Sequence, residues 1–445
     1  MNPDSVNGVA VIGGGLAGCE AAYQLAKRGL RVTVFEMRYT GRDERSPMTT
    51  PAHQSGLLAE LVCSNSLKSV ETANAHGLLK AELELLDSLV VRTAKLSAVP
   101  AGKALAVDRT AFARAMTGRV SALPGVTIKQ EEVAAIPAAP AVIASGPLTS
   151  DRLAADLARA FGAANLFFYD AIAPIVAAES LDTGRMFRGS RNSDDGEYWN
   201  CPLTKQQYQD FATALVRAER HRPHGFEAGH YYEGCLPVEA LAERSIDGLR
   251  FGMMRPVGLF NPHEGRRPYA VVQLRQENAA GTMYNLVGFQ TQLAQHEQRR
   301  VFALIPGLER AEYLRYGSMH RNTYLNAPGL LTAALQCIPR PGLFLAGQLT
   351  GVEGYVESAA TGLVAGINLA RLLGGGEAAV PPETTMIGQL CRHVATAAGP
   401  YQPMNANFGL LPPPAAATRD KRERNAAHAE RSLRDLRAWA AANAI

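Results

Sequence analysis

The chain has 445 residues, of which 47% are hydrophobic and 19% charged, and its formal net charge is +4. This length predicts two or three domains, and the hydrophobic content is typical of globular proteins with sizeable cores. There is no low-complexity tract and no apolar run of about 18 residues, which argues against a disordered or membrane-spanning chain. No basic segment followed by an apolar one opens the sequence, so we expect a cytoplasmic protein.

Six cysteines are scattered singly along the chain, with no CxxC pair and no His/Cys cluster at metal-ligand spacing. This pattern predicts neither a disulfide framework nor a metal site. A single cysteine in a polar setting is a candidate nucleophile, whereas one on an apolar helix is usually part of a core.

The stretch Val9–Glu36 is typical of a dinucleotide-binding βαβ unit. Gly13 suits the tight turn, Gly15 lets the backbone approach a pyrophosphate, and Gly18 lets the helix pack closely on the sheet. Glu36 stands where a carboxylate accepts hydrogen bonds from ribose hydroxyls and disfavours a 2′-phosphate, which leaves FAD or NAD. The expected cofactor contacts of this unit are Gly13, Gly14, Gly15, Leu16, Ala17, Gly18 and Glu36.

Further elements of the same domain follow along the chain. We predict an amphipathic helix around Gly77–Leu89 and a second helix over Arg109–Val120, for which Asp108 is the N-cap. A strand is expected at Val126–Gln130, and a buried strand that ends on a glycine at Ala141–Gly146. This order suits a further pair of parallel strands.

Residues 166–320 change to aromatic-rich segments separated by Pro, Gly and Asn, which indicates an inserted α+β domain. The chain then returns to a glycine-rich strand and helix. Gly347 is expected to end the strand, and a helix entered near Ala360–Gly366, including Gly362, to present small residues and backbone N–H groups to the cofactor. Gln348 stands where many flavoproteins have Asp, which removes one expected ribityl hydrogen bond but remains compatible with FAD.

We therefore predict an α/β fold in which a Rossmann-type, glutathione-reductase-like FAD-binding domain is interrupted by an inserted α+β domain. The first part of the FAD-binding domain covers residues 1–165, the insertion 166–320, and the second part, with a basic C-terminal helix, 321–445. The sequence holds only one full GxGxxG, so no second Rossmann domain for NAD(P)H is expected, and a nicotinamide would visit the flavin transiently.

Two cysteines lie in settings that favour chemistry. Cys63 in AELVCSNSLKS is followed by hydroxyl and amide groups that can hydrogen-bond a thiolate or a heteroaromatic ring. Cys235 in HYYEGCLPVEAL lies in an expected loop. Cys201 has the same local look as Cys235, and the residues alone favour Cys63 as the nucleophile because its polar surroundings are richer.

Two other polar segments are candidates for ligand contact. The span Gly317–Pro328 is dense in polar groups, although a polar hinge between domains would look similar; its candidate substrate or folate contacts are His320, Arg321, Asn322 and Tyr324. The tail Thr418–Ile445 has seven Lys/Arg and four Asp/Glu, which indicates either a solvated helix face or a surface for a phosphate backbone.

A family resemblance rests on motifs that recur in order, among them GGGLAGCEAA, MTTPAH, ELVCSNSLKS, SGPLTS, EGCLPVE, VVQLRQE, MHRNTYLNAP and GVEGYVESAATG. From Val9 to Pro414 the chain resembles the bacterial folate- and FAD-dependent tRNA (uracil-5-)-methyltransferases. VCSNSL and MHRNTYLNAP are far more particular than a dinucleotide fingerprint.

The resemblance implies that a T-loop uridine of tRNA is methylated, with carbon from methylenetetrahydrofolate and electrons from FADH2, which NAD(P)H replenishes. It assigns Cys235 as the nucleophile and Cys63 as general base and organiser of the flavin pocket. A folate pteridine between the flavin and His320 or Tyr324 is a further hypothesis. The implied partners are tRNA, folate and a nicotinamide, with no metal and no membrane.

Rival functions are weaker. A flavin disulfide or quinone reductase would need a redox cysteine pair and usually its own nicotinamide domain. A non-catalytic RNA-binding flavoprotein would not need both matched cysteines. The same chemistry on ribosomal RNA remains the closest alternative, and the related tRNA wobble-uridine flavoprotein lacks the VCSNSL and MHRNTYLNAP pair.

Overall fold

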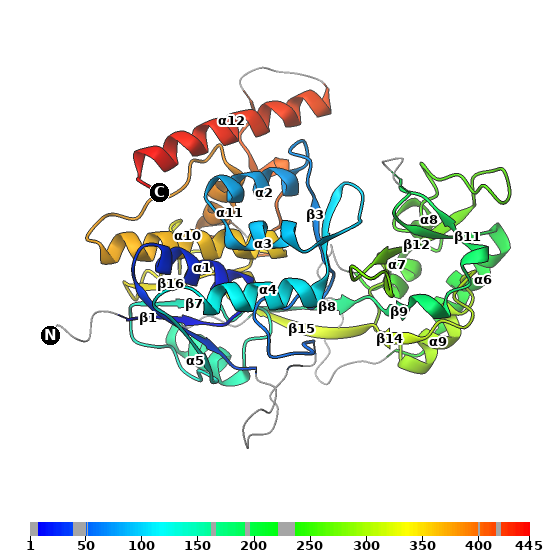
Figure 1. The fold of residues 1–445 in the computed structure, drawn as a ribbon, viewed down its shortest axis with the longest axis horizontal. Coiled ribbons are helices and arrows are strands. Elements are labelled where there is room, and N and C mark those ends of the chain that lie inside the picture. The colour runs from blue at the N-terminus through cyan, green and yellow to red at the C-terminus, as the bar shows by residue number, and fades with distance from the viewer. Residues whose placement is uncertain are drawn as a thin grey trace.

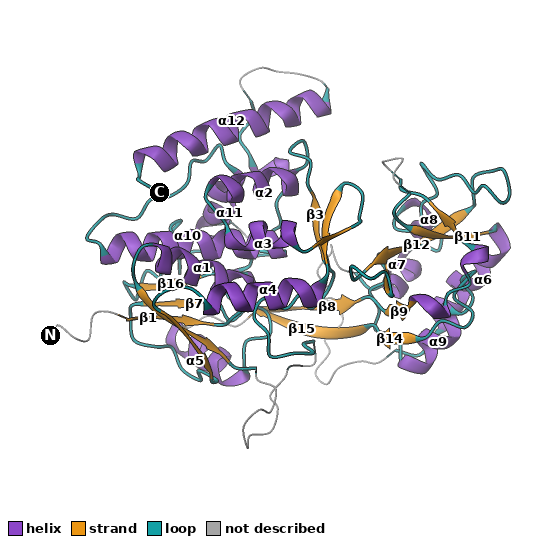
Figure 2. Ribbon diagram, in the orientation of Figure 1, coloured by secondary structure: helices purple, strands orange, loops and turns teal. Residues whose placement is uncertain are grey.

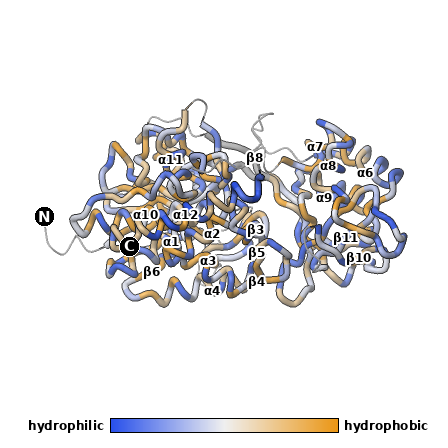
Figure 3. The backbone as a smooth tube through the Cα atoms, turned by 90° about the horizontal axis from the view of Figure 1, so that it is seen from above, coloured by the Kyte–Doolittle hydropathy of each residue, from blue (hydrophilic) through white to orange (hydrophobic). Residues whose placement is uncertain are grey.

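The computed structural model describes residues 8–38, 50, 52–161, 166–191, 196–220, 236–398, 401–414 and 420–445, without the side chains of 166–170, 320 and 321. Two regions lie end to end in it, each built around its own sheet and its own hydrophobic core (Figures 1 and 3). We call them the parallel-sheet region and the antiparallel-sheet region.

The parallel-sheet region has five parallel strands, and apolar residues dominate its three central ones. In spatial order they are β16 (Leu343–Leu345), β7 (Ala141–Ile143), β1 (Gly8–Ile12), β2 (Arg31–Glu36) and β6 (Val126–Gln130). From β1 the order runs to β2 on one side and to β7 on the other, so the loop after β1 lies at the topological switch point, where ligands of such sheets bind.

Helices pack on this sheet and on one another (Figure 2). They are α1 (Leu16–Lys27), α2 (Ala75–Leu85), α3 (Leu89–Leu96), α4 (Arg109–Ser121), α5 (Asp151–Phe161), α10 (Tyr355–Leu373), α11 (Met386–Thr396) and α12 (Lys421–Ala442). Short 3-10 turns span Ala178–Ser180, Thr183–Arg185, Gln348–Thr350 and Phe408–Leu410.

Two helix predictions need correction. The helix expected around Gly77–Leu89 is two helices, α2 and α3, because Asp87 adopts a left-handed φ of 58° and the Ser88 side chain caps a new helix at Val91 N. The later helix, α10, begins at Tyr355 rather than near Ala360, since Gly354 with φ of 125° is its N-cap. The expected helix over Arg109–Val120 and its Asp108 cap are confirmed.

The sheet of the antiparallel-sheet region has six strands among the described residues. In spatial order they are β10 (Phe187–Arg188), β11 (Trp199–Leu203), β12 (Ala270–Gln276), β13 (Met283–Leu286), β9 (Ile175–Ala177) and β14 (Tyr313–Arg315). Its helices are α6 (Lys205–Arg217), α7 (Val238–Arg244), α8 (Gly248–Phe251) and α9 (Gln295–Phe302). Phe211, Phe289 and Phe302 pack their rings together in its core, where centroids lie 5.7 to 6.5 Å apart.

A two-stranded ribbon joins the two regions. β8 (Leu166–Ile172) pairs antiparallel with β15 (Ser318–Tyr324), from Ser318 opposite Ile172 to Tyr324 opposite Leu166. A small sheet of β3 (Ser66–Ser69), β5 (Ala104–Val107) and β4 (Ala98–Val99) lies beside the junction (Figure 1). The mixed architecture confirms the predicted fold class, whereas the limits 1–165, 166–320 and 321–445 stay a prediction.

The basic C-terminal segment forms α12, which packs on α2. Its buried face includes Ala429, Ser432 and Leu436, and the Ser432 hydroxyl donates to the buried carboxylate of Glu82 on α2. Arg422 and other basic residues of α12 are exposed. The helix is therefore part of the parallel-sheet region's structure, whatever its exposed face binds.

Candidate active site at the junction of the two regions

The glycine turn after β1 has the geometry that its sequence predicts. Gly13 has φ of 103°, and a Cβ there would lie 2.5 Å from Ala144 O. A Cβ on Gly18 would lie 1.8 Å from Gly13 O, so only glycine lets α1 start this close to the strand. A Cβ on Gly15 would meet nothing within 4 Å, because it faces open space.

That open space is a cavity, here called the dinucleotide cavity. Among its lining residues are Gly13, Gly15, Leu16, Ala17, Glu36, Arg38, Ser145, Leu148, Gly347, Gln348 and Tyr355. Gly15 caps α1 without a side-chain hydrogen bond, and no acidic residue lies in the first turn. Backbone N–H groups at such a helix start suit a pyrophosphate, so this part of the cavity suits the phosphates of a dinucleotide.

Glu36 lies in this cavity but is already fully hydrogen-bonded. Its carboxylate accepts from Arg38 N (3.0 Å), Arg38 Nε (2.9 Å) and Arg38 Nη2 (3.1 Å), and from Gly14 N (3.0 Å). Since a carboxylate has about four lone-pair sites, a ribose hydroxyl must share an occupied one. The guanidinium of Arg38 holds the Glu36 carboxylate in place, and the sequence did not predict this role for Arg38.

A second cavity, the substrate cavity, lies between the two regions and has a volume of about 320 Å³. Among its lining residues are Cys63, Ser64, Ser66, Lys68, Leu148, Arg275, Asn322, Gln348, Tyr355 and Glu357. Leu148, Gln348 and Tyr355 line both cavities. A ligand ring bound in the substrate cavity would therefore lie next to one bound at the inner end of the dinucleotide cavity.

Tyr355, the first residue of α10, holds the Cys63 loop. Its hydroxyl oxygen accepts from Cys63 N at 2.8 Å and from Ser64 N at 3.2 Å. Burial raises the pKa of the Tyr355 phenol, so this group stays neutral at physiological pH. The sulfur of Cys63 lies 3.9 Å from Ala171 O at the end of β8.

Arg109, at the start of α4, holds the same loop from its other side. Its guanidinium donates to Leu61 O (2.8 Å) and Cys63 O (2.9 Å) and pairs with Glu277 at 2.6 Å. Burial alone lowers the pKa of Arg109, but the charge and hydrogen bond of Glu277, together with smaller contributions from Tyr355 and Cys63, leave the pKa raised. Since Glu277 follows β12, this pair ties the loop to the antiparallel-sheet region.

Arg275 of β12 makes a second tie. Its Nε donates to Asn65 Oδ1 and its Nη2 to Ser64 Oγ, each at 2.8 Å. The Asn65 amide in turn donates to Val107 O and Gln276 O, each at 3.0 Å. The VCSNS segment thus owes its shape to residues from both regions.

Glu357 and His76 form a pair at the wall of the substrate cavity, 3.1 Å apart. Burial alone raises the pKa of Glu357, but the hydrogen bond from His76 and the charges of Lys68 and His76 leave it lowered. Glu357 also accepts from Ala406 N at 3.0 Å. A carboxylate therefore faces this cavity at neutral pH.

The predicted site residues differ in where the structure places them. Gly13, Gly15, Leu16, Ala17, Glu36 and Gly347 line the dinucleotide cavity, while Cys63 and Asn322 line the substrate cavity. Gly14 and Gly18 shape the turn from behind. Cys235 lies outside the described residues, as do the side chains of His320 and Arg321.

Two predicted contacts have other positions. A Cβ on Gly362 would lie 2.2 Å from Ala17 O, so Gly362 lets α10 cross α1, and the early start of α10 puts it inside the helix. Tyr324 is 4% exposed, and its hydroxyl donates to Tyr401 O at 3.3 Å. Neither residue is among those that line the two cavities.

The other described cysteines are buried. Burial raises the pKa of Cys391 to about 12 and raises that of Cys19 and Cys201 further. Cys201, which the sequence did not rank below Cys235, therefore has no reactive setting.

In the described ranges no helix is long and apolar enough to cross a membrane. The same ranges hold no group of three or more His, Cys, Asp or Glu side chains that could bind a metal.

Comparisons with known proteins show the family of this chain. The family model "Glucose inhibited division protein A" matches residues 8–377. A Pelotomaculum thermopropionicum protein named methylenetetrahydrofolate--tRNA-(uracil-5-)-methyltransferase TrmFO is 56% identical over 96% of this chain and 97% of its own length. The protein of that name from Geobacter sulfurreducens is 52% identical over 97% of this chain and 99% of its own. The chain belongs to the TrmFO family.

Solved structures support the fold of this TrmFO family member. Aquifex aeolicus GidA, in two crystal forms, superposes with TM-scores of 0.66 and 0.68 at 18% identity. The matches cover 96% and 97% of this chain and 74% and 75% of the GidA chain.

Sequence reasoning missed the roles of Tyr355, Arg109 and Arg275. A usable signal was present for one of them: Arg275 is a charged residue in AVVQLRQ, an otherwise largely apolar strand. A buried charge needs partners, and those partners lie far away in sequence.

Proposed function

We propose that the protein forms 5-methyluridine in the T-loop of tRNA, with methylenetetrahydrofolate as carbon donor and FADH2 as reductant. The observation that carries this proposal is the wall shared by the dinucleotide cavity and the substrate cavity at Leu148, Gln348 and Tyr355, with Cys63 in the second. The names of the relatives support the reaction.

The reaction explains why two cysteines are needed. Uracil C5 is a weak nucleophile, and a thiolate that adds to C6 makes C5 enolate-like and able to take a methylene carbon. Cys235 is the proposed nucleophile. Cys63, fixed by Tyr355 and Arg109, is the proposed base that removes the C5 proton. Bound reduced FAD supplies the hydride that completes the methyl group.

The residues that would hold FAD are those of the dinucleotide cavity. The uncapped start of α1 would bind the pyrophosphate, and Glu36, oriented by Arg38, the adenosine ribose. NAD(P)H is the proposed electron donor and the cytoplasm the proposed compartment. A uridine inside a folded RNA must be flipped out to reach Cys63.

For folate, His320 is the proposed stacking partner, since the buried ring of Tyr324 packs at 6.1 Å from that of Tyr401 instead. Replacement of His320 by Ala should weaken methylenetetrahydrofolate binding, measured by titration, while Tyr324→Phe leaves it unchanged. Equal affinities in all three proteins would rule out stacking on His320.

The direct test is mass-spectrometric mapping of 5-methyluridine. The purified protein is incubated with FAD, NADPH, labelled methylenetetrahydrofolate and, separately, unmodified tRNA or ribosomal RNA fragments. Label in the tRNA T-loop supports the proposal. Label only in ribosomal RNA would support the proposed reaction but show that the substrate is ribosomal RNA. Label in neither RNA, with FAD bound and reduced, would rule out the methyltransferase activity.

A further inference from the structure

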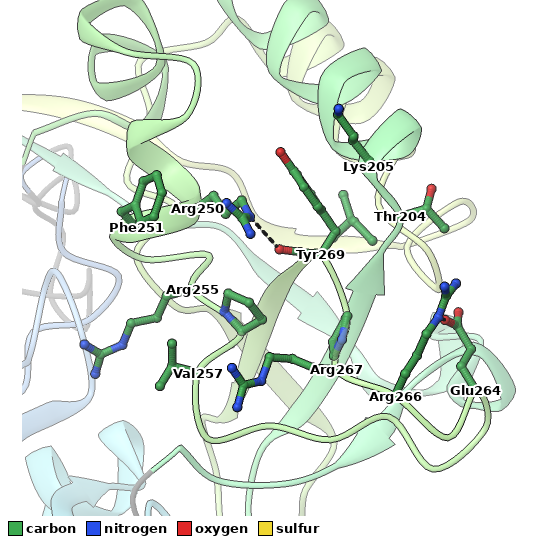
Figure 4. Close-up of a pocket in the computed structure, with 13 residues that line it drawn as sticks. Thr204, Lys205, Arg250, Phe251, Arg255, Val257, Glu264, Arg266, Arg267 and Tyr269 are labelled. Carbon is green, nitrogen blue, oxygen red and sulfur yellow. Dashed lines mark hydrogen bonds and ion pairs between the residues drawn. The ribbon is translucent and has the colours of Figure 1, made fainter.

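A basic cavity lies in the antiparallel-sheet region, outside the active site (Figure 4). We call it the arginine cavity; its volume is about 680 Å³. Its charged lining residues are Lys205, Arg250, Arg255, Glu264, Arg266 and Arg267. Five of these six are basic, so the cavity carries an excess of positive charge.

Most of this positive charge is not neutralised by the protein. Arg266 pairs with Glu264 at 2.8 Å, and Figure 4 shows the two side chains together, with the guanidinium groups of Arg255 and Arg267 extending elsewhere. In the part of the chain that the structure describes, no carboxylate pairs with Arg255, Arg267 or Lys205.

A second cavity, here the bridging cavity, continues from the first toward the active site. Arg255 lines both, and the bridging cavity adds Arg191 and Tyr198 from one region. From the other region it adds Ser69 and the ion pair of Lys103 with Glu71, at 2.9 Å, so its unpaired positive charge comes from Arg191 and Arg255. Arg191 Nε is buried and has no hydrogen-bond partner among the described residues. Its Nη2 donates to Met253 O at 2.7 Å, and burial and the charge of Arg255 lower the pKa of Arg191 to about 10, which leaves it a cation at neutral pH.

Two strands lead on from the bridging cavity to the substrate cavity. Gln273 of β12 lines the bridging cavity, and Arg275, two residues on and hence on the same face, lines the substrate cavity. On β3, Ser69 lines the bridging cavity, while Ser66 and Lys68 line the substrate cavity. The three cavities therefore follow one another across the junction.

We propose that this series of cavities, from Arg267 and Arg255 through Arg191 to the Cys63 loop, is a track for the phosphate backbone of the RNA substrate. The proposal rests on the proposed function, since it needs an RNA whose target base reaches Cys63. Unpaired guanidinium groups bind phosphates and release counterions, which makes affinity depend on salt. Phe251, 74% exposed beside the arginine cavity, offers a ring on which an unpaired base can stack, which favours RNA over free phosphate.

The test compares two double variants of the FAD-loaded protein. Arg255→Gln with Arg267→Gln removes two charges of the track. Arg217→Gln with Arg310→Gln removes two exposed charges of the same region that line none of these cavities. Affinity for unmodified tRNA is measured across a salt series, together with kcat and KM for 5-methyluridine formation.

For the track variant we expect at least about tenfold weaker binding, a salt slope smaller by about two, and a raised KM with kcat retained. Affinity and slope equal to those of the control variant would overturn the track. If wild-type protein forms no 5-methyluridine but the track variant still binds tRNA more weakly than the control, the track stands and the proposed function falls.

Discussion

The dinucleotide cavity and the substrate cavity share part of one wall but are built in different ways. The phosphate-binding end of the first is lined by backbone at Gly13, Gly15 and Gly347, which one local βαβ segment and one return strand position, while side chains such as Leu16 and Arg38 line the rest. Side chains from both regions form the second, and the Cys63 loop is held by Tyr355, Arg109 and Arg275. The shape of a backbone-lined site is determined by residues that are neighbours in sequence. The shape of a site held by long-range side-chain hydrogen bonds depends on the whole fold.

The largest loss of stability should come from adding a methyl group at the glycine turn of the dinucleotide cavity. In Gly18→Ala the new Cβ would lie 1.8 Å from Gly13 O, so α1 must move and the free energy of unfolding should fall by at least about 3 kcal/mol, with FAD lost. Absorbance of bound flavin and thermal unfolding measure both.

Gly118→Ala is the matched control, because a Cβ there meets nothing within 4 Å and the site is inside α4. It should stabilise the protein by up to about 1 kcal/mol. Retained flavin in Gly18→Ala would break the contrast between the two cavities.

In the substrate cavity, Tyr355→Phe should reduce methylation activity without loss of flavin. It leaves the N–H groups of Cys63 and Ser64 without their acceptor, at a cost of about 1–3 kcal/mol. The loop then shifts, and kcat/KM for methylation should fall about 10- to 100-fold. Tyr324→Phe, which removes a buried hydroxyl that lines neither cavity, should change kcat/KM less than about threefold.

The features that the sequence predicted are those that depend on neighbouring residues, and the features that it missed depend on distant ones. The parallel strands, the turn at Gly13 and the capped helix at Asp108 were predictable because neighbours in sequence determine them. The start of α10 was missed because Gly354, and not the small-residue stretch, sets it. Cys63 could be nominated from its polar neighbours, but its support by Tyr355 lies 292 residues away and no local pattern reports it.

Glu82 lines neither cavity, so a substitution there should change the stability of the fold and leave the active site unchanged. Burial raises the pKa of Glu82 to about 7, although Ser432, Ile387 and Met386 donate hydrogen bonds to it. Because the folded pKa lies above the unfolded value of about 4.3, Glu82 stabilises the fold at low pH, and this contribution is lost as pH rises through about 7.

Glu82→Gln should therefore gain stability relative to wild type by about 1 kcal/mol between about pH 6 and pH 8. Urea unfolding at both pH values measures the gain, and flavin content should stay equal. A constant difference between the two proteins would show that Glu82 does not titrate in this range.

The smallest effect concerns chemical labelling. Cys63 is partly exposed in the substrate cavity, whereas Cys19, Cys201 and Cys391 are buried, so iodoacetamide at neutral pH should label Cys63 well ahead of these three. Peptide mass spectrometry over time gives the order. Early labelling of Cys19 would mean that the packing around the glycine turn opens readily.

The β8–β15 ribbon also bears on how such a protein could arise. The segment between Ile172 and Ser318 leaves the parallel-sheet region after β8 and returns to it at β15, and Ile172 and Ser318 are paired with each other. A short turn in its place would close β8 and β15 into an ordinary hairpin, so the parallel-sheet region would lose no strand if the segment were absent. The fold thus permits acquisition of a whole substrate-facing module at a single hairpin, at little cost in loop closure.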